Sequence, residues 1–312
     1  MNNFEQLIKS ILSNKVFEQR PPVLIDIGAS GEIFEKWTLI ADKSICIAFD
    51  ADDRDFTFDS AEGDTGYRKL YKFNRIVLSS AQKECTFYLT KSPYCSSTLK
   101  PDKENLADWM FAPLFEVERE VKLPCTTVEE CLNNVKLDYI DWYKVDSQGI
   151  DMDIFLSIPQ GIRDNILAAD FEPGLMDAYL NENKMAGLLT MLDNESYWIS
   201  SFDVKGTQRL DQKYSSLSGQ LHESPCWAGV TSLKKVDGSY NLRSALLLMV
   251  FSFVENQWGY ALQICETMSA VDPIFDKLHA EILSVVKRNE KKQSEKLYPQ
   301  LKKLVKKAIG RK

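Results

Sequence analysis

Near the N-terminus stands the stretch Val23-Leu24-Ile25-Asp26-Ile27-Gly28-Ala29-Ser30-Gly31, which decides the fold that we predict. It opens with a short, mostly apolar run that ends at Gly28, as a parallel strand buried on both faces does. Glycine permits a positive φ and lets a ligand approach the backbone closely. A helix after such a turn offers free N–H groups to a carboxylate or phosphate. By itself the turn is a weak signal, because many purely structural turns have two glycines at this spacing.

The residues that follow complete a strand–turn–helix–strand unit. Residues 33–40 have the apolar spacing of a helix, and Ile45–Phe49 form a second apolar run that ends at Asp50. This is the opening unit of a nucleotide-binding α/β fold, in which an acid after the second strand accepts ribose hydroxyls. Asp50 follows Gly28 by 22 residues. We therefore expect Asp50 to bind an adenosine, the alternative being an acid in a solvated loop.

The rest of the chain predicts further strands and then helices alone. Strand patterns occur at 76–78, 85–89, 115–121, 139–145, 166–171, 197–204 and 227–233, and a capping pattern at 126–130 predicts a short helix. Residues 52–68 are polar and predict an exposed loop. After residue 240 only helical spacing is found, at 242–254, 260–268, 274–286 and 297–309. We therefore predict an N-terminal helix at 1–20, an α/β domain at 21–235 and an accessory helical region at 240–312.

Composition narrows the class of protein. The 312 residues carry a net charge of -7, yet residues 287–312 hold 11 of the 38 lysines and arginines. An acidic body with a basic tail is a poor general nucleic-acid binder, so we expect no nucleic-acid partner. The seven cysteines are scattered without a C-x-x-C pair, which argues against a zinc site or a disulfide scaffold. Because neither a signal peptide nor a long apolar span is visible, we expect a cytoplasmic location.

The C-terminal tail leaves two alternatives open. Apolar residues recur at helical spacing in 297–309 with lysines around them, which is typical of a basic amphipathic helix. Such a helix is suited to peripheral contact with an anionic membrane, here the inner membrane face. The alternative, which we favour, is that the helix packs on the protein's own acidic body.

A third group of residues follows the predicted strand at 139–145. Asp146 stands at the carboxyl end of this strand, and Gly149 precedes a short helix. Asp170 and Glu172 stand at the corresponding end of the next predicted strand. Ligands of open α/β sheets bind in the crevice outside the carboxyl ends of the strands, so these acids are candidates for chemistry.

In this order the segments resemble the FkbM-type methyltransferases. Lys144–Asp151 is similar to that family's K-I-D-V-E-G-x-E, although Gln148 replaces the glutamate before the glycine. Asp26–Gly31 resembles its D-x-G-A-N-x-G loop, with Ser30 where asparagine is usual. Further similarities are the F-E-P-D-like Phe49–Asp52, the serine pair Ser96-Ser97 and the acid after the next strand. The resemblance covers residues 20–205 and leaves the C-terminal helices outside.

The resemblance implies a Rossmann-like class I methyltransferase sheet and methyl transfer from S-adenosylmethionine to an oxygen. The acceptor would be a sugar hydroxyl of a glycan, a glycolipid or a related metabolite. We expect the cofactor to be bound by Asp26, Gly28, Ser30, Gly31, Asp50, Ser79 and Asp146. We expect the acceptor to be bound by Ser96, Ser97, Asn105 and Asp151.

The acid expected to take the proton from the acceptor hydroxyl is Asp146, with Asp170 and Glu172 as second choices. The sulfonium methyl of the cofactor is already electrophilic, so the protein has mainly to align the acceptor with it. Asp146 is nearly as well placed to contact the amino group of the cofactor. Two of these carboxylates could instead hold Mg2+, which prefers oxygen ligands, and no spacing decides this point.

Two other functions stay open. A non-catalytic interaction scaffold on a methyltransferase fold is favoured by Gln148 and by the irregular first loop. An NAD-dependent sugar-modifying enzyme would share the first strand and Asp50, but the loop lacks the third glycine of G-x-G-x-x-G. Tyr139 and Lys144 also have the wrong separation for a Tyr-x-x-x-Lys pair. The sequence therefore favours the methyltransferase.

Overall fold

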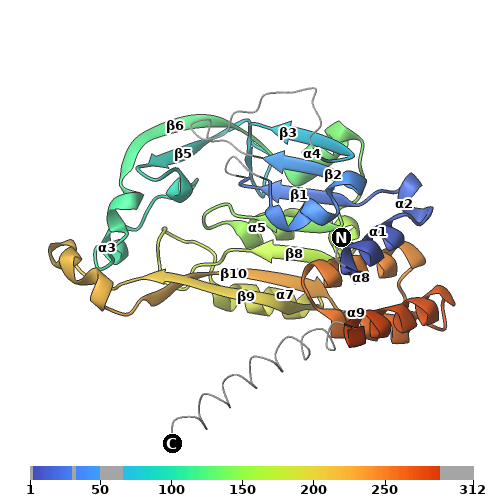
Figure 1. Cartoon of the computed structure of the whole chain (residues 1–312). Coiled ribbons are helices and arrows are strands. Elements are labelled where there is room, and N and C mark those ends of the chain that lie inside the picture. The colour runs from blue at the N-terminus through green and yellow to red at the C-terminus, as the bar shows by residue number, and fades with distance from the viewer. Residues whose placement is uncertain (1–2, 30–32, 50–65, 289–312) are drawn as a thin grey trace, which may run out of the picture. The chain divides into compact units, whose positions relative to one another are not determined.

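The computed structural model describes residues 3–29, 33–49 and 66–288, and the chain divides into two compact units (Figure 1). One unit spans Leu12–Lys235, and the other combines Met1–Ile11 with Val236–Lys312. Helices α1 (Asn3–Leu12) and α2 (Val16–Gln19) form within the predicted N-terminal helix. Outside the described residues lie Ser30, Gly31, Asp50, most of the predicted 52–68 loop and the predicted tail helix at 297–309. Both alternatives for that tail, packing on the acidic body and contact with an anionic membrane, therefore stay predictions.

Within the described residues, the unit at Leu12–Lys235 is built on a sheet of seven strands. They are β1 (Val23–Ile27), β2 (Ile45–Phe49), β3 (Lys69–Phe73), β7 (Trp142–Val145), β8 (Ala168–Phe171), β9 (Tyr197–Thr207) and β10 (Ser224–Lys234). Their order is β3-β2-β1-β7-β8-β10-β9. Neighbours from β3 to β8 are parallel, whereas β10 is antiparallel to both β8 and β9. The fold class is thus α/β with a mostly parallel sheet, compatible with the predicted Rossmann-like fold.

The strand order reverses at the contact between β1 and β7. From β1 the chain builds outward through β2 to β3, and then returns to β7 and builds in the opposite direction. Ligands of open α/β sheets bind at such a reversal, outside the carboxyl ends of the strands. Because Gly28 directly follows β1 and Asp146 directly follows β7, the fold places both residues at this point.

One face of the sheet is covered by α4 (Val128–Val135), α5 (Asp151–Ser157) and α7 (Met185–Asn194), and α6 (Gln160–Arg163) follows α5. Successive side chains of a strand point to opposite faces, so alternate residues reach these helices. They form one buried cluster, which includes Ile25, Tyr143, Phe155, Phe171 and Leu188. The predicted capping pattern is confirmed, because Thr127 and Glu130 bond each other's backbone N–H groups at the start of α4.

The connection from β1 to β2 differs from the sequence prediction. The sequence predicts a helix at 33–40, whereas the structure has the 3-10 helices η1 (Glu35–Leu39) and η2 (Ala41–Lys43). The prediction was wrong because the Phe34 N–H donates to the Asp26 carboxylate at 2.8 Å, which draws the short link onto the sheet. Residues 34–43 therefore lack the α-helix whose N-terminus was expected to offer free N–H groups to a ligand. The Trp37 ring of this connection packs on Trp142, with centroids 6.1 Å apart.

A second sheet is inserted between β3 and α4. It consists of β4 (Ile76–Val77), β5 (Glu84–Thr90) and β6 (Val117–Thr126) in the order β4-β6-β5. Between β5 and β6 lie η3 (Pro93–Cys95), α3 (Lys103–Leu106) and η4 (Ala112–Phe115). The sequence predicts the third strand at 76–78, but β3 takes that place in the main sheet. The pattern misses β3 because Lys69 and Lys72 interrupt its apolar residues at a partly exposed edge.

β9 and β10 continue beyond the main sheet as a long hairpin, whose connection contains η5 (Gln212–Gln220). The hairpin contacts the inserted segment. Arg209 pairs with Asp108 at 2.6 Å, and the Met110 N–H donates to the Gln208 carbonyl at 3.1 Å. Figure 1 shows the outer part of the hairpin on the same side of the unit as α3. Two segments far apart in the sequence therefore lie against each other beside the main sheet.

The unit that contains Val236–Lys312 has helices α8 (Leu242–Val254) and α9 (Trp258–Met268) and a further helix at 274–288. Residues 245–253 of α8 are all buried, as expected of a helix that is apolar on every side. The rings of Phe253 and Trp258 stack with centroids 5.0 Å apart. Among the described residues, no helix is both long and apolar enough to cross a membrane.

A row of polar side chains crosses the main sheet on the face that carries η1. In register, Asp26 lies beside Lys144, Lys144 beside Asp170, and Asp170 beside Thr231. Lys144 Nζ is 2.8 Å from Asp26 Oδ1. Asp170 accepts hydrogen bonds from Thr231 Oγ1 and Trp142 Nε1, each at 2.5 Å. Buried charges need such partners, because removing one of them leaves the other charge uncompensated in the interior.

We predict that Lys144→Met destabilises the protein at pH 7 by about 3–5 kcal/mol, because it leaves the buried Asp26 charge without its partner. The matched control is Lys43→Met, which breaks an exposed pair with Asp42 and should change stability by less than about 1 kcal/mol. Urea unfolding measures both variants. Equal losses of stability would contradict the role given to the polar row.

Candidate active site

Three adjoining cavities, all among the described residues, hollow the carboxyl ends of the strands. The β2 cavity lies beside the ends of β1 and β2 and has a solvent-accessible volume of about 90 Å³. The aromatic cavity lies between the inserted segment and the β9–β10 hairpin, with about 550 Å³. The sheet-face cavity lies over β7, β8, β9 and β10, with about 440 Å³. Asp146 lines each of the three, so it stands where they meet.

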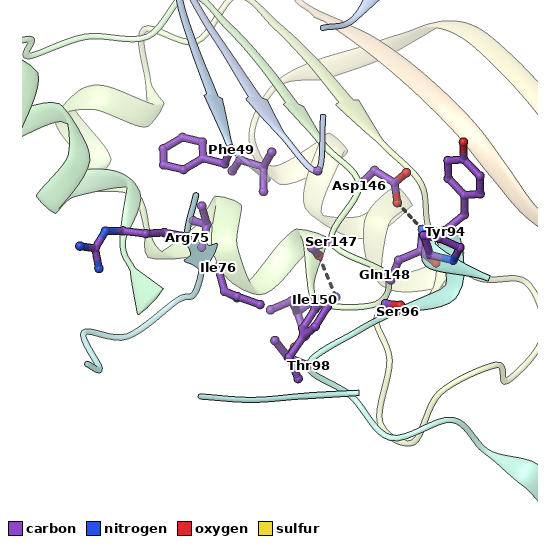
Figure 2. Close-up of a pocket in the computed structure, with 15 residues that line it drawn as sticks. Phe49, Arg75, Ile76, Tyr94, Ser96, Thr98, Asp146, Ser147, Gln148 and Ile150 are labelled. Carbon is purple, nitrogen blue, oxygen red and sulfur yellow. Dashed lines mark hydrogen bonds between the residues drawn. The ribbon is translucent and has the colours of Figure 1, made fainter. Parts of the chain in front are cut away.

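The β2 cavity is lined by both apolar and polar side chains (Figure 2). Its lining combines the apolar residues Ile27, Phe49, Ile76, Val77, Phe87, Pro93 and Ile150 with the polar residues Arg75, Tyr94, Ser96, Thr98, Asp146, Ser147 and Gln148. Figure 2 shows Phe49 and Arg75 on one side and Asp146 with Gln148 on the other. A flat, largely apolar group with a polar substituent fits such a lining.

Gly28 brings the ends of β1 and β7 together. Its φ is +78°, and a Cβ there would lie 2.1 Å from the Asp146 carbonyl oxygen, so only glycine fits. The N–H groups of Gly28 and Ala29 both donate to the Phe49 carbonyl at 3.0 Å. The Gly28 carbonyl accepts from Lys144 Nζ at 2.9 Å. The predicted cofactor turn is therefore tied to β2 and β7 through its own backbone.

Asp146 is held from two directions. Its N–H donates to the Ile27 carbonyl at 2.9 Å, and its Oδ1 accepts from the Gln148 side-chain amide at 2.5 Å. Burial and the nearby Glu172 raise the pKa of the Asp146 carboxyl well above its usual range, while the Lys144 ammonium opposes this rise. Once ionised, a carboxylate with a raised pKa is a stronger base than an ordinary aspartate.

Rings from separate segments line the aromatic cavity. Phe111 and Phe115 come from the inserted segment, Tyr179 from the loop after β8, and Trp227 from β10. The ring centroids of Phe111 and Trp227 are 6.0 Å apart, and those of Phe115 and Tyr179 are 5.5 Å apart. Phe111 and Phe115 also touch, at 5.1 Å. The rings therefore form a continuous wall, against which the apolar face of a ring-shaped ligand can pack.

Glu172 connects this wall to the centre of the site. Its Oε1 accepts from Trp227 Nε1 at 3.1 Å and lies 3.3 Å from Lys205 Nζ. Glu172 lines both the aromatic and the sheet-face cavities. Of the acids predicted for catalysis, Asp146 and Glu172 thus both line the aromatic and the sheet-face cavities.

Two other predicted acids are engaged within the protein. Asp170 borders the sheet-face cavity, but its two oxygens already accept bonds from β7 and β10. Asp151 is 3% exposed, and it accepts from the N–H and hydroxyl of Ser147 and from the Glu172 N–H at 3.0 Å. Burial raises the pKa of both carboxyls. Asp151 therefore joins the loops after β7 and β8, a geometry that favours positioning of Glu172 over contact with an acceptor.

The predicted serines and asparagine are not brought to one place. Ser96 lines the β2 cavity, whereas Ser97 is fully buried and donates to the backbone of the loop after β7. Ser79 and Asn105 are exposed, and neither belongs to the lining of the three cavities as the structure describes them. Asn105 instead bonds Asp102 at the start of α3.

Among the predicted cofactor residues, Gly28 and Asp146 line the β2 cavity. Asp26 is fully buried in its pair with Lys144, so it holds the turn instead of facing the cavity. Ser30, Gly31 and Asp50 fall outside the described residues, and their roles stay predictions.

Sequence reasoning missed several residues of the site, namely Arg75, Phe111, Tyr179, Glu182 and Lys205. No local pattern marks them, because the aromatic cavity is assembled from segments that lie far apart in the sequence. In the parts of the chain that the structure describes, no group of three or more His, Cys, Asp or Glu side chains is arranged to hold a metal ion. The Mg2+ alternative therefore also stays a prediction.

No known protein-family model matches the chain, and a search of the curated proteins finds no match. A functional assignment therefore depends on the residues of the site and their geometry.

We predict that Gly28→Ala destabilises the protein by about 2–4 kcal/mol, because it adds a Cβ 2.1 Å from the Asp146 carbonyl at a positive φ. Gly229→Ala is the matched control, since a Cβ at Gly229 meets nothing within 4 Å. Thermal unfolding followed by circular dichroism compares the two variants. A Gly28→Ala protein as stable as Gly229→Ala would show that the close approach of β1 and β7 is not required.

Proposed function

We propose that the protein is an S-adenosylmethionine-dependent O-methyltransferase whose acceptor is a sugar hydroxyl of a glycan, a glycolipid or a related metabolite. The observation that carries the proposal is the position of Asp146. It follows β7 at the strand reversal and borders both the β2 cavity and the aromatic cavity. A transferase needs such an arrangement, because donor and acceptor must meet at one point in the correct orientation.

The strand order favours this class over a dehydrogenase. Numbered in chain order, the seven strands of the main sheet described above read 3-2-1-4-5-7-6, and the seventh is antiparallel to its neighbours. The dinucleotide-binding sheet has the order 3-2-1-4-5-6. An antiparallel strand inserted at this place is typical of class I methyltransferases, the class that the resemblance to the FkbM-type enzymes also implies.

The residues of the β2 cavity fit the adenosyl part of the cofactor. Phe49, Ile76 and Ile150 provide the apolar flanks that a flat base needs, and Thr98 and Arg75 add polar groups. Gly28 lines the same cavity and lets β1 and β7 approach so closely that no Cβ fits beside the Asp146 carbonyl. When bound, the cofactor supplies a methyl group on a positively charged sulfur, which an oxygen nucleophile attacks.

The acceptor is assigned to the aromatic cavity. Its rings can pack on the face of a sugar ring, and Glu172 can accept hydrogen bonds from the hydroxyls. The ionised Asp146 takes the proton from the hydroxyl that reacts, at the junction of the two cavities. Contact of Asp146 with the cofactor's amino group is the alternative role, and it predicts loss of cofactor binding in Asp146→Asn.

Calorimetric titration tests the cofactor assignment. We expect the wild type to bind S-adenosylmethionine and S-adenosylhomocysteine and not NAD. Thr98→Arg places a long cation in the β2 cavity and should weaken binding of both sulfur compounds at least tenfold, on the order of 1.4 kcal/mol. Leu114→Arg is the control, because Leu114 is exposed at the aromatic cavity, and it should bind as the wild type does.

If the wild type binds neither sulfur compound, the methyltransferase proposal is refuted and the interaction scaffold is favoured. Binding of NAD would favour the dehydrogenase. If Thr98→Arg binds the sulfur compounds as tightly as the wild type does, the cofactor lies outside the β2 cavity.

The pH dependence of methyl transfer tests the base. Asp146 acts only when ionised, and its pKa is raised, so kcat/KM should fall as the pH drops through that raised pKa and level off above it. Glu172→Gln removes a negative charge that raises this pKa, so the acidic limb should move to lower pH. Asp146→Asn should reduce kcat by about 10²–10⁴-fold. An acidic limb that stays in place in Glu172→Gln would exclude Asp146 as the titrating base.

A further inference from the structure

Gln148 has a backbone conformation that a glutamine seldom adopts. Its φ is +57°, in the left-handed region, and Gly149 follows with a φ of +119°. The loop is held there by its neighbours, because the Ser97 hydroxyl donates to the Gln148 carbonyl at 2.7 Å and the Asn183 N–H donates to the Gly149 carbonyl at 2.7 Å. Residues held in such conformations gather at functional sites.

The Gln148 side chain joins the two cavities, both of which it lines. Its Nε2 donates to Asp146 Oδ1 at 2.5 Å, and its Oε1 lies 3.0 Å from the Tyr179 hydroxyl. That hydroxyl is also 2.9 Å from the Cys95 carbonyl and has one proton to donate. An amide can donate to Asp146 on one side and accept from Tyr179 on the other. A carboxylate or a thioether of the same length cannot do both.

The charged and titratable groups that face Asp146 are Glu172 after β8, Asp151 of α5, Lys144 of β7 and, beyond Gln148, Tyr179 and Cys95. Glu172, itself paired with Lys205, and Asp151 raise the pKa of Asp146, whereas the Lys144 ammonium, itself paired with Asp26, lowers it. A donor that bonds the ionised carboxylate also lowers this pKa, and the Gln148 amide is such a donor.

We propose that Gln148 is a positioning residue, whose amide turns the Asp146 carboxylate toward the junction of the cavities and is itself fixed by Tyr179. The expected effect on methyl transfer rests on the proposed function, whereas the hydrogen bond between Gln148 and Asp146 does not. Glutamate, usual at this position in the resembling family, would place a second carboxylate against Asp146 here. Gln148 is then part of a working site and not a mark of lost activity.

The test follows the titration of Asp146 in the full chain by carbon NMR of the carboxyl groups, with its signal assigned by its absence from Asp146→Asn. Gln148→Met keeps the length of the side chain and removes the donor, so the pKa of Asp146 should rise by about one unit. Gln148→Glu should raise it further, because two carboxylates in contact share one proton. Gln82→Met changes an exposed glutamine and should leave the titration in place.

Tyr179→Phe is the second probe, because it removes only the hydroxyl beside Gln148 Oε1. Tyr179→Phe should raise the pKa of Asp146 by less than Gln148→Met does. The Gln148 amide still donates to Asp146 in this variant, but it loses its contact with the Tyr179 hydroxyl. This variant keeps the inference testable if a change at the left-handed position prevents folding.

Methyl transfer gives the kinetic readout. In Gln148→Met the acidic limb of kcat should move up by about one pH unit, with the KM for the cofactor within about twofold of the wild type. A purely structural role would lower kcat at every pH without moving the limb. An Asp146 titration unchanged in both Gln148 variants overturns the inference, whatever the enzyme does. A shifted titration in a protein that transfers no methyl group supports the contact and refutes the proposed function.

Discussion

The structure depends on one ion pair inside a sheet, that of Asp26 on β1 with Lys144 on β7. These strands meet where the strand order reverses, and each charge has the other as its compensation in a largely buried setting. A slip of one residue would turn Lys144 into the apolar face packed by α4 and α5, so the pair fixes the register. Once the register is fixed, the turn at Gly28 and the carboxylate of Asp146 have one position relative to each other.

The two sides of the site have different physical origins. The β2 cavity is lined by the ends of β1 and β2, by the loop after β7, and by β4, β5 and the segment around η3 of the insertion. The aromatic cavity is made by loops, by the inserted segment and by the β9–β10 hairpin. Asp146, Gln148 and Tyr94 border both cavities, and the hydrogen bond between Gln148 and Asp146 is one contact that links them.

The sequence predicts the parts whose signals are local. The buried runs at 23–27 and 45–49 are strands, and Gly28, Asp146 and Glu172 reach the site because each directly follows a strand. The α-helix predicted at 33–40 is replaced by 3-10 helices, whose conformation is set by contacts with the sheet, namely the Phe34 N–H with Asp26 and the Trp37 ring with Trp142. Phe115 and Tyr179 could not be predicted as neighbours, since only the tertiary fold brings them together. Asp151 shows the opposite case. Its motif predicts contact with an acceptor, but its carboxylate accepts hydrogen bonds from Ser147 and Glu172 within the protein.

The hairpin of β9 and β10 extends past the sheet, and this has a consequence for how such a protein can diversify. Trp227 and Lys205 lie on the hairpin, and Phe111 lies on the insertion that meets it. Substitutions there alter the wall of the aromatic cavity while the ion pair and the Gly28 turn keep their surroundings. The shape of the aromatic cavity can therefore change while the centre of the sheet stays as it is.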